Sequence, residues 1–186
     1  MLNDVERECI VKHGYGLHSF AHALVQTFER LSVNPVTTEL REQIRSFTHA
    51  ISDHDIELLP EVAETLQYLS KKHRLLLVTK GALAEQSGKI ERSGLKRYFA
   101  AAEIVAEKNF ATYEALVEKY ELIRGNTWMI GNSPKSDINP ALAVGLNAVF
   151  VPHGDTWILE HEELNAAPEG QRFLIAAGFA ELREHF

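Results

Sequence analysis

The chain has 186 residues, a length that suits one domain, or one domain with a small insertion. Its 45% hydrophobic and 24% charged residues are ordinary for a globular protein, and a net charge of −7 argues against a nucleic-acid partner held by electrostatics. The single cysteine, Cys9, cannot form an internal disulfide, and the sequence shows neither a membrane-spanning run nor a signal peptide. We therefore expect a cytoplasmic protein with no membrane partner.

Residues 1 to about 57 have the pattern of helices. Apolar side chains at helical spacing form one face from Leu17 to Leu31 and a second from Leu40 to Ile51. The pair Asn34-Pro35 separates the two faces. No stretch in this region resembles a strand, so we expect a small helical module over residues 1–57.

Strands and helices alternate from residue 58 onwards. Pro60 is expected to open a helix, and the apolar run Leu75–Val78 is typical of a strand buried on both faces of a parallel sheet. The pattern then predicts strands at 102–105, 126–130, 147–151 and 172–175, with helices at 82–93, 110–123, 137–144 and 178–186. This alternation predicts an α/β fold with a doubly wound parallel sheet, covered by helices on both sides.

Polar groups follow three of these strands. Thr79 and Lys80 end the first strand, Lys108 lies between a strand and a helix, and Gly131-Asn132-Ser133-Pro134-Lys135-Ser136-Asp137 follows the Trp128 strand. One carboxylate among hydrogen-bonding groups suits a hard cation beside a phosphate. Taken singly, each of these residues has an ordinary explanation: Thr79 caps helix 82–93, Lys108 is a solvated lysine, and Asp137 begins a helix.

In this order, the three segments resemble the motifs of the haloacid dehalogenase-like (HAD) hydrolases. The family has Thr or Ser after one strand, a lone Lys after another, and Gly-Asp-Ser-x-x-x-Asp after a third. The resemblance covers residues 58 to 151, about half the chain, with Asn132 in place of the family's first aspartate. It implies that Thr79, Lys80 and Lys108 bind phosphate, that Thr79 and Lys108 take part in catalysis, and that Asp137, with Asn132 and Ser133, holds Mg²⁺.

The family's first motif, Asp-x-Asp-x-Thr with the nucleophilic aspartate, is absent from these 186 residues. The one Asp-x-Asp, Asp53-His54-Asp55, follows a helical pattern and lacks the threonine, so we do not expect it to be catalytic. The simplest account is a chain that begins inside the family's cap, with residues 1–57 as helical cap module and 58–186 as a core domain without its first strand. His18 and His22, four residues apart, could bind a metal, but Phe20 and Ala21 of the apolar face lie between them, so the flank of a helix is the better explanation.

The resemblance implies a phosphatase that uses Mg²⁺ and acts on a small phosphorylated metabolite, inactive as this chain stands. One alternative is a non-catalytic phosphate-binding or regulatory module; another is a doubly wound protein with no phosphate chemistry. Two structural expectations follow. The first is that the polar residues after the strands converge on one cleft; these residues are Thr79, Lys108, Asn132, Ser133 and Asp137. The second is that the strands at Leu75–Val78 and Trp128–Ile130 pair directly or are separated by another segment.

Overall fold

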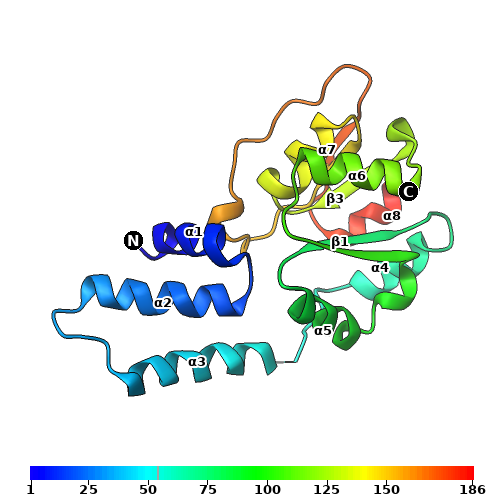
Figure 1. Cartoon of the computed structure of the whole chain (residues 1–186). Helices are drawn as coiled ribbons and strands as arrows, with labels where there is room; N and C mark the ends of the chain where they lie inside the picture. Colours follow the sequence, from blue (N-terminus) through cyan, green and yellow to red (C-terminus); the bar gives the residue numbers. More distant parts are fainter. Residues whose placement is uncertain (54) are drawn as a thin grey trace. The chain divides into compact units, whose positions relative to one another are not determined.

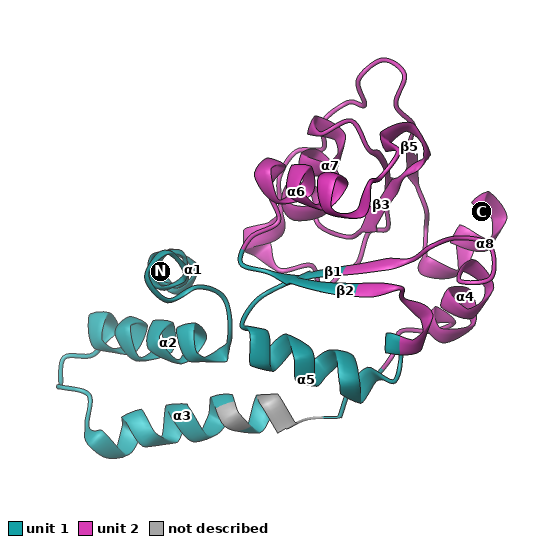
Figure 2. Cartoon of the chain, turned by 45° about the vertical axis from the view of Figure 1, so that its right-hand side comes forward, with its two compact units in different colours: residues 1–57, 78–96, 102–106 teal, residues 58–77, 97–101, 107–186 magenta. Residues whose placement is uncertain are grey.

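The computed structural model describes residues 1–53 and 55–186, with the side chains of residues 49, 52 and 53 also left out. The chain divides into two compact units (Figure 2). The first comprises residues 1–57, 78–96 and 102–106, and the second residues 58–77, 97–101 and 107–186. The division into a cap module at 1–57 and a core domain at 58–186 stays a prediction. The Asp53 side chain and the whole of His54, from the Asp53-His54-Asp55 segment, lie outside what the structure describes.

The first unit begins with three successive helices that pack side by side (Figure 1). They are α1 (Leu2–His13), α2 (Leu17–Leu31) and α3 (Thr38–Asp53), so the helical pattern of this region is confirmed. Val5 and Cys9 of α1 and Ala23 of α2 are fully buried and form the core between these two helices. Cys9 is a free thiol that packs as a small apolar side chain.

Helix α5 (Leu83–Ser93) holds the start of α2 within this unit. The Glu85 carboxylate accepts hydrogen bonds from the backbone N–H of Leu17 at 2.9 and 3.2 Å. A helix N-terminus has unsatisfied N–H groups, and Gly16 at the N-cap has no side chain to offer them. Gly16 has φ +133°, and a Cβ there would lie 3.0 Å from Oε1 of Glu85, so this residue has to be glycine.

The five strands of the described chain lie in two sheets. β1 (Leu76–Lys80) pairs with β2 (Ala101–Val105), while β3 (Trp128–Gly131), β4 (Asn147–Phe150) and β5 (Phe173–Ile175) form the second sheet in that order. The β3–β4 and β4–β5 pairs are parallel, as expected. Val149 in the middle of β4 stands opposite Ile130 and Leu174, which sets the register.

Direct pairing of the Leu75–Val78 strand with the Trp128–Ile130 strand is wrong. β1 and β3 lie in different sheets, each hydrogen-bonded to one neighbouring strand among the described residues. The expectation that the first strand is buried on both faces also fails, because all five residues of β1 are half-buried. A strand of a two-stranded sheet keeps an edge without a strand partner, whereas β4, with a partner on either side, buries its first three residues. Whether another segment separates β1 from β3, and whether helices cover both sides of one doubly wound sheet, stay predictions.

Several helix boundaries differ from the predicted ones for local reasons. α4 (Val62–Leu69) begins two residues after Pro60, because Glu61 takes a left-handed conformation with φ 59°. α6 (Phe110–Tyr120) ends three residues early at Glu121, which has φ 51°. The C-terminal residues form a 3₁₀ turn, Phe179–Glu181, followed by a short helix, α8 (Leu182–His185). Other single 3₁₀ turns occur at Lys96–Tyr98, Arg124–Asn126 and Ile158–Glu160.

The helix predicted at 137–144 starts three residues earlier. A π-helical turn, Pro134–Ile138, leads into α7 (Asn139–Ala143), and Gly145 with φ +87° follows its end. Ile138 and Leu142 pack with Ala148 of β4 in one core cluster, so this turn is anchored on the sheet. Across the described chain, no helix is both long and apolar enough to span a bilayer.

Candidate active site

The loop after β3 places a buried carboxylate beside a lysine. Asp137 Oδ1 accepts a hydrogen bond from Nζ of Lys108 at 2.7 Å, with 6% and 14% of the two side chains exposed. Lys108 comes from the segment between β2 and α6, 29 residues earlier in the chain. Charges are taken out of water only when they are paired, so the ion pair explains how both groups are tolerated here. Two residues that the sequence picked out from separate motifs are thus in contact.

Ser133 binds the second oxygen of the Asp137 carboxylate. Its backbone N–H donates to Oδ2 of Asp137 at 3.0 Å, and its hydroxyl oxygen accepts from the N–H of Ser136 at 2.9 Å. The same hydroxyl donates to Oε2 of Glu160 at 2.6 Å. Ser133 therefore caps the π-helical turn and links two buried carboxylates, Asp137 and Glu160. Both oxygens of Asp137 are engaged by protein donors.

Gly131 leaves the space that Asp137 occupies. A Cβ at position 131 would lie 2.2 Å from Oδ2 of Asp137 and 2.7 Å from its Cβ, closer than real atoms approach. The glycine that ends β3 is therefore required by the packing of the carboxylate against the strand backbone, and not by an unusual φ angle.

We expect Gly131→Ala to push Asp137 out of place and to lower the free energy of unfolding by about 1–3 kcal/mol, the usual cost of overpacking. The measurement is urea unfolding followed by tryptophan fluorescence, since both tryptophans, Trp128 and Trp157, lie in the second unit. The matched control is Gly154→Ala, because a Cβ at position 154 meets nothing within 4 Å. Equal stability of the two variants would contradict this account of the loop.

Two residues that the sequence did not single out belong to this cluster. Tyr113 of α6 is buried, and its hydroxyl donates to the Ser136 carbonyl at 2.9 Å. Burial, and next the negative charges of Asp137 and Glu160, raise the pKa of Tyr113 far above its usual range, so it stays a neutral donor. Neither residue had a sequence signal: Tyr113 falls within an ordinary amphipathic helix, and Glu160 is one of three glutamates between 160 and 163.

Asn132, proposed as a weaker metal ligand, is exposed, and its side chain forms a hydrogen bond with Thr156. Its side-chain amide donates to Oγ1 of Thr156 at 2.8 Å. Lys135 in the same loop donates to the Leu159 carbonyl at 3.2 Å. Both contacts tie the loop after β3 to the segment that follows β4.

Thr79 and Lys80 belong to the first unit. The Thr79 hydroxyl donates to the side-chain oxygen of Gln86 at 2.9 Å, and α5 has no side-chain cap at its N-terminus. The ordinary explanation of Thr79 as a helix cap is therefore wrong. Nζ of Lys80 donates to the Tyr15 hydroxyl at 3.2 Å and lies 4.3 Å from the centre of that ring.

The structure thus brings Lys108, Ser133 and Asp137 together and places Asn132 beside them in the loop. Thr79 and Lys80 lie in a different unit, so the convergence of all these residues on one cleft stays a prediction.

The residues described do not make a magnesium site by themselves. Mg²⁺ needs near-octahedral oxygen ligands, and Asp137 already faces the ammonium group of Lys108 and the N–H of Ser133. Among the side chains that the structure describes, no group of three or more His, Cys, Asp or Glu residues is arranged to hold a metal ion.

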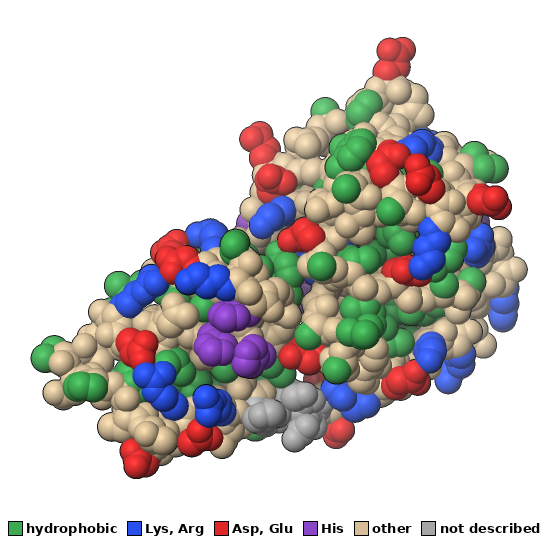
Figure 3. All heavy atoms as spheres, viewed as in Figure 1, with side chains coloured by type: hydrophobic (Ala, Val, Ile, Leu, Met, Phe, Trp, Pro, Cys, Tyr) green, Lys and Arg blue, Asp and Glu red, His purple; other side chains and the backbone are tan. Residues whose placement is uncertain are grey.

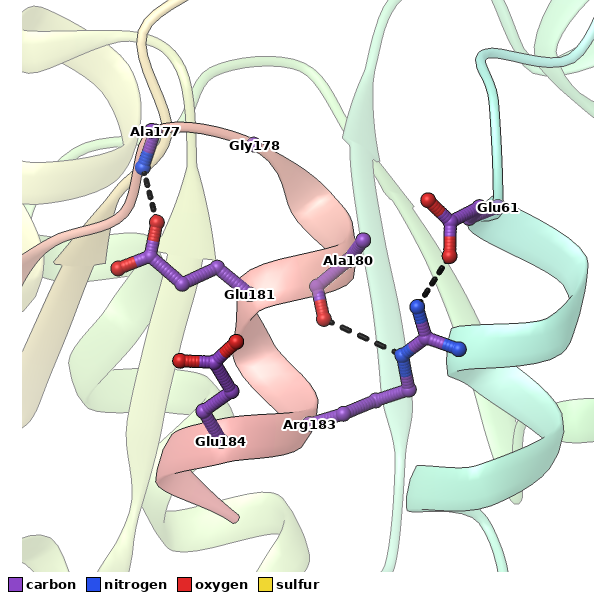
Figure 4. A pocket seen from close by; sticks show the side chains of 7 residues that line it. All are labelled: Glu61, Ala177, Gly178, Ala180, Glu181, Arg183 and Glu184. Atoms are coloured by element: carbon purple, nitrogen blue, oxygen red, sulfur yellow. Dashed lines mark hydrogen bonds and ion pairs between the residues drawn. The ribbon is translucent and has the colours of Figure 1, made fainter.

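An open depression near the C-terminus contains none of these residues (Figure 4). Its lining residues are Glu61, Ala177, Gly178, Ala180, Glu181, Arg183 and Glu184. Arg183 pairs with Glu61, and the N–H of Ala177 donates to Glu181, so polar groups of the depression satisfy one another. We assign no function to it.

Comparison with a family model and with solved structures gives the same family. The family model for "haloacid dehalogenase-like hydrolase" matches residues 9–151. A haloacid dehalogenase-like family hydrolase from Xanthomonas campestris is 27% identical; the match covers 99% of this chain and 73% of that one, with a TM-score of 0.85. No curated protein matches the chain.

Two more distant structures share the fold. The HAD-hydrolase YfnB from Bacillus subtilis, bound to magnesium, is 14% identical over 99% of this chain and 80% of that one, with a TM-score of 0.69. A protein described as a predicted phosphoglycolate phosphatase from Haemophilus somnus is 18% identical over 99% and 86%, with a TM-score of 0.66.

Proposed function

Because this chain belongs to the haloacid dehalogenase-like hydrolases, we propose that it carries the phosphate-recognition part of a phosphatase site for a small phosphorylated metabolite. The observation that carries the proposal is the Lys108–Asp137 pair beside Ser133, in the loop that follows β3. The carboxyl ends of parallel strands are where α/β proteins bind ligands. The magnesium-bound relative and the relative described as a phosphatase support this direction.

Each residue has a role in the proposal. Lys108 neutralises charge on the phosphoryl group, and Thr79 and Lys80 bind its oxygens, since phosphoryl transfer depends on positioning and electrostatic stabilisation. Asp137 is the proposed metal ligand, with Ser133 holding it in orientation and Asn132 beside it. The helices of residues 1–57 act as the cap that closes over the substrate and selects it.

Mg²⁺ is the proposed cofactor of the complete site, and we expect it to bind the 186-residue chain weakly. Asp137 supplies one carboxylate, and both its oxygens are engaged by Lys108 and Ser133. The chain also lacks the Asp-x-Asp-x-Thr motif that in this family supplies the nucleophile. We therefore propose that the chain by itself is catalytically inactive.

The second candidate is a non-catalytic phosphate-binding or regulatory module. The observation in its favour is the same closed ion pair, because the ammonium group of Lys108 already neutralises Asp137 without any metal. Both candidates bind phosphate, and they differ in whether adding the missing Asp-x-Asp-x-Thr segment produces turnover.

Phosphate binding tests what both candidates share. We expect inorganic phosphate to bind the chain in calorimetric titration, and Lys108→Ala to weaken binding roughly tenfold to hundredfold, the range for a lost charged hydrogen bond. Thr79→Val, which keeps the shape and removes the hydroxyl, should also weaken binding. The control is Lys71→Ala, an exposed lysine outside the site that should leave the affinity unchanged. Binding that is insensitive to both site variants would rule out the proposed location.

A further inference from the structure

Three histidines gather where α1 meets α2, in the first unit. His13 is the last residue of α1, and His18 and His22 lie one turn apart near the start of α2. The ring centres of His18 and His22 are 4.6 Å apart with the rings nearly perpendicular, and His13 stacks on His22 at 4.8 Å. Figure 3 shows histidine side chains together in one purple group on the surface.

The two rings of α2 turn the same nitrogen toward each other. Nε2 of His18 and Nε2 of His22 are 3.2 Å apart. Two imidazoles bound to one tetrahedral ion, with metal–nitrogen distances of about 2.0–2.1 Å, place their nitrogens roughly 3.3 Å apart. The two nitrogens therefore already lie at about that separation, joined by a hydrogen bond whose proton a bound ion would replace. His18 is exposed and His22 half-buried, so an ion can reach the pair from water.

We propose that His18 and His22 form a two-imidazole chelate for a late first-row divalent cation such as Zn²⁺, Ni²⁺ or Cu²⁺. Imidazole nitrogens suit these ions, whereas Mg²⁺ prefers oxygen ligands, so the site is distinct from the loop after β3. Among the described residues, no set of three or more His, Cys, Asp or Glu side chains is arranged to hold a metal ion, so we expect water to complete the coordination. His13, stacked face to face on His22, supports that ring and is not a ligand.

The charged side chains around His18 and His22 should keep the affinity for the cation moderate. The positive charge of Arg45 in α3 acts weakly on His22, and Lys12 precedes His13, so positive charge opposes the ion. Glu85 of α5, whose carboxylate lies beside the start of α2, is engaged by the N–H of Leu17. The bound ion would join two successive turns of α2, and binding to the folded state alone raises stability. Zn²⁺ should accordingly raise the thermal midpoint of the intact chain.

The test is calorimetric titration of the untagged 186-residue chain, freed of metal with EDTA, using ZnCl₂, NiCl₂ and MgCl₂ separately. We expect one equivalent of Zn²⁺ or Ni²⁺ to bind and no saturable uptake of Mg²⁺ at the histidines. His18→Ala and His22→Ala should each weaken binding at least about tenfold, because each removes one of two ligands. Circular dichroism confirms that each variant keeps its helices.

Two control variants test whether His18 and His22, and not other histidines, are the metal ligands. His73→Ala removes an exposed histidine of the second unit and should leave the affinity unchanged. His13→Ala should change the affinity less than either ligand variant, since it removes a packing contact only. Absence of saturable Zn²⁺ and Ni²⁺ binding, or binding that survives in the His18→Ala/His22→Ala double variant, would overturn the proposal. A loss with His13→Ala as large as with His18→Ala would contradict the two-ligand assignment.

Discussion

The 186-residue chain is expected to hydrolyse p-nitrophenyl phosphate no faster than background, with or without Mg²⁺. The proposed roles of Thr79 and Lys108 are to position and neutralise a phosphate, neither residue attacks phosphorus in this family, and the sequence contains no Asp-x-Asp-x-Thr. Covalent catalysis splits one difficult step into two, and positioning alone does not replace it. Fusing an apolar strand with Asp-x-Asp-x-Thr before Met1 should therefore raise the magnesium-dependent rate by a factor on the order of a thousand or more.

Controls on the fused chain separate the possible results. Asp137→Ala should abolish most of the gained activity, and the same fusion with the first Asp of the motif changed to Ala should show none. A fused chain that binds phosphate but stays inactive would favour the non-catalytic module. Magnesium-dependent turnover by the unfused chain, lost on Asp53→Ala or Asp55→Ala, would place the nucleophile at Asp53-His54-Asp55 and overturn our placement of the site.

Breaking the buried ion pair should have the largest effect on stability. Lys108→Met leaves the Asp137 carboxylate buried without its cation, and Asp137→Asn leaves a buried ammonium group without its anion. We expect each single variant to lose about 3–5 kcal/mol of unfolding free energy, the usual result when one partner of a buried pair is removed. The double variant should be more stable than the sum of the two losses implies, because no unpaired charge remains.

Urea unfolding followed by tryptophan fluorescence measures all three variants in the unit that contains the pair. The comparison is Arg183→Met, which breaks an ion pair with Glu61 in the same unit. The two side chains of that pair are 35% and 55% exposed, so its loss should cost no more than about 1 kcal/mol. Similar losses for Lys108→Met and Arg183→Met would show that the buried pair has no special role in the loop.

The local elements could be predicted well from the sequence because their signals are local. Apolar periodicity indicated α2 and α3, and the run Leu75–Val78 indicated a strand, since each pattern depends on neighbouring residues alone. The contact of Lys108 with Asp137 was implied by the order of family motifs and not by any local pattern. The helix ends that differed at Glu61 and Glu121 depend on φ angles, which hydrophobic patterns do not record.

Contacts between segments that are distant in the sequence could not be predicted, because they depend on how the elements pack. The split of the strands into two sheets depends on which backbone edges meet, and β1 has the same apolar composition whether it is central or at an edge. Glu160 became part of the site only because the segment after β4 returns to Ser133. The approach of His13 to His22 likewise depends on the turn between α1 and α2, whereas the spacing of His18 and His22 could be read directly.

The central claim is that Thr79 and Lys108 act on the same phosphate. The most direct measurement is a titration of the ¹⁵N-labelled chain with inorganic phosphate, followed by the backbone amide signals of Thr79, Gly81, Lys108 and Ser133. We predict that signals from both units shift together and fit a single dissociation constant, and that Lys108→Ala suppresses the shifts at Thr79 as well as those at Ser133. Shifts confined to one unit, or two unrelated dissociation constants, would contradict a shared phosphate site.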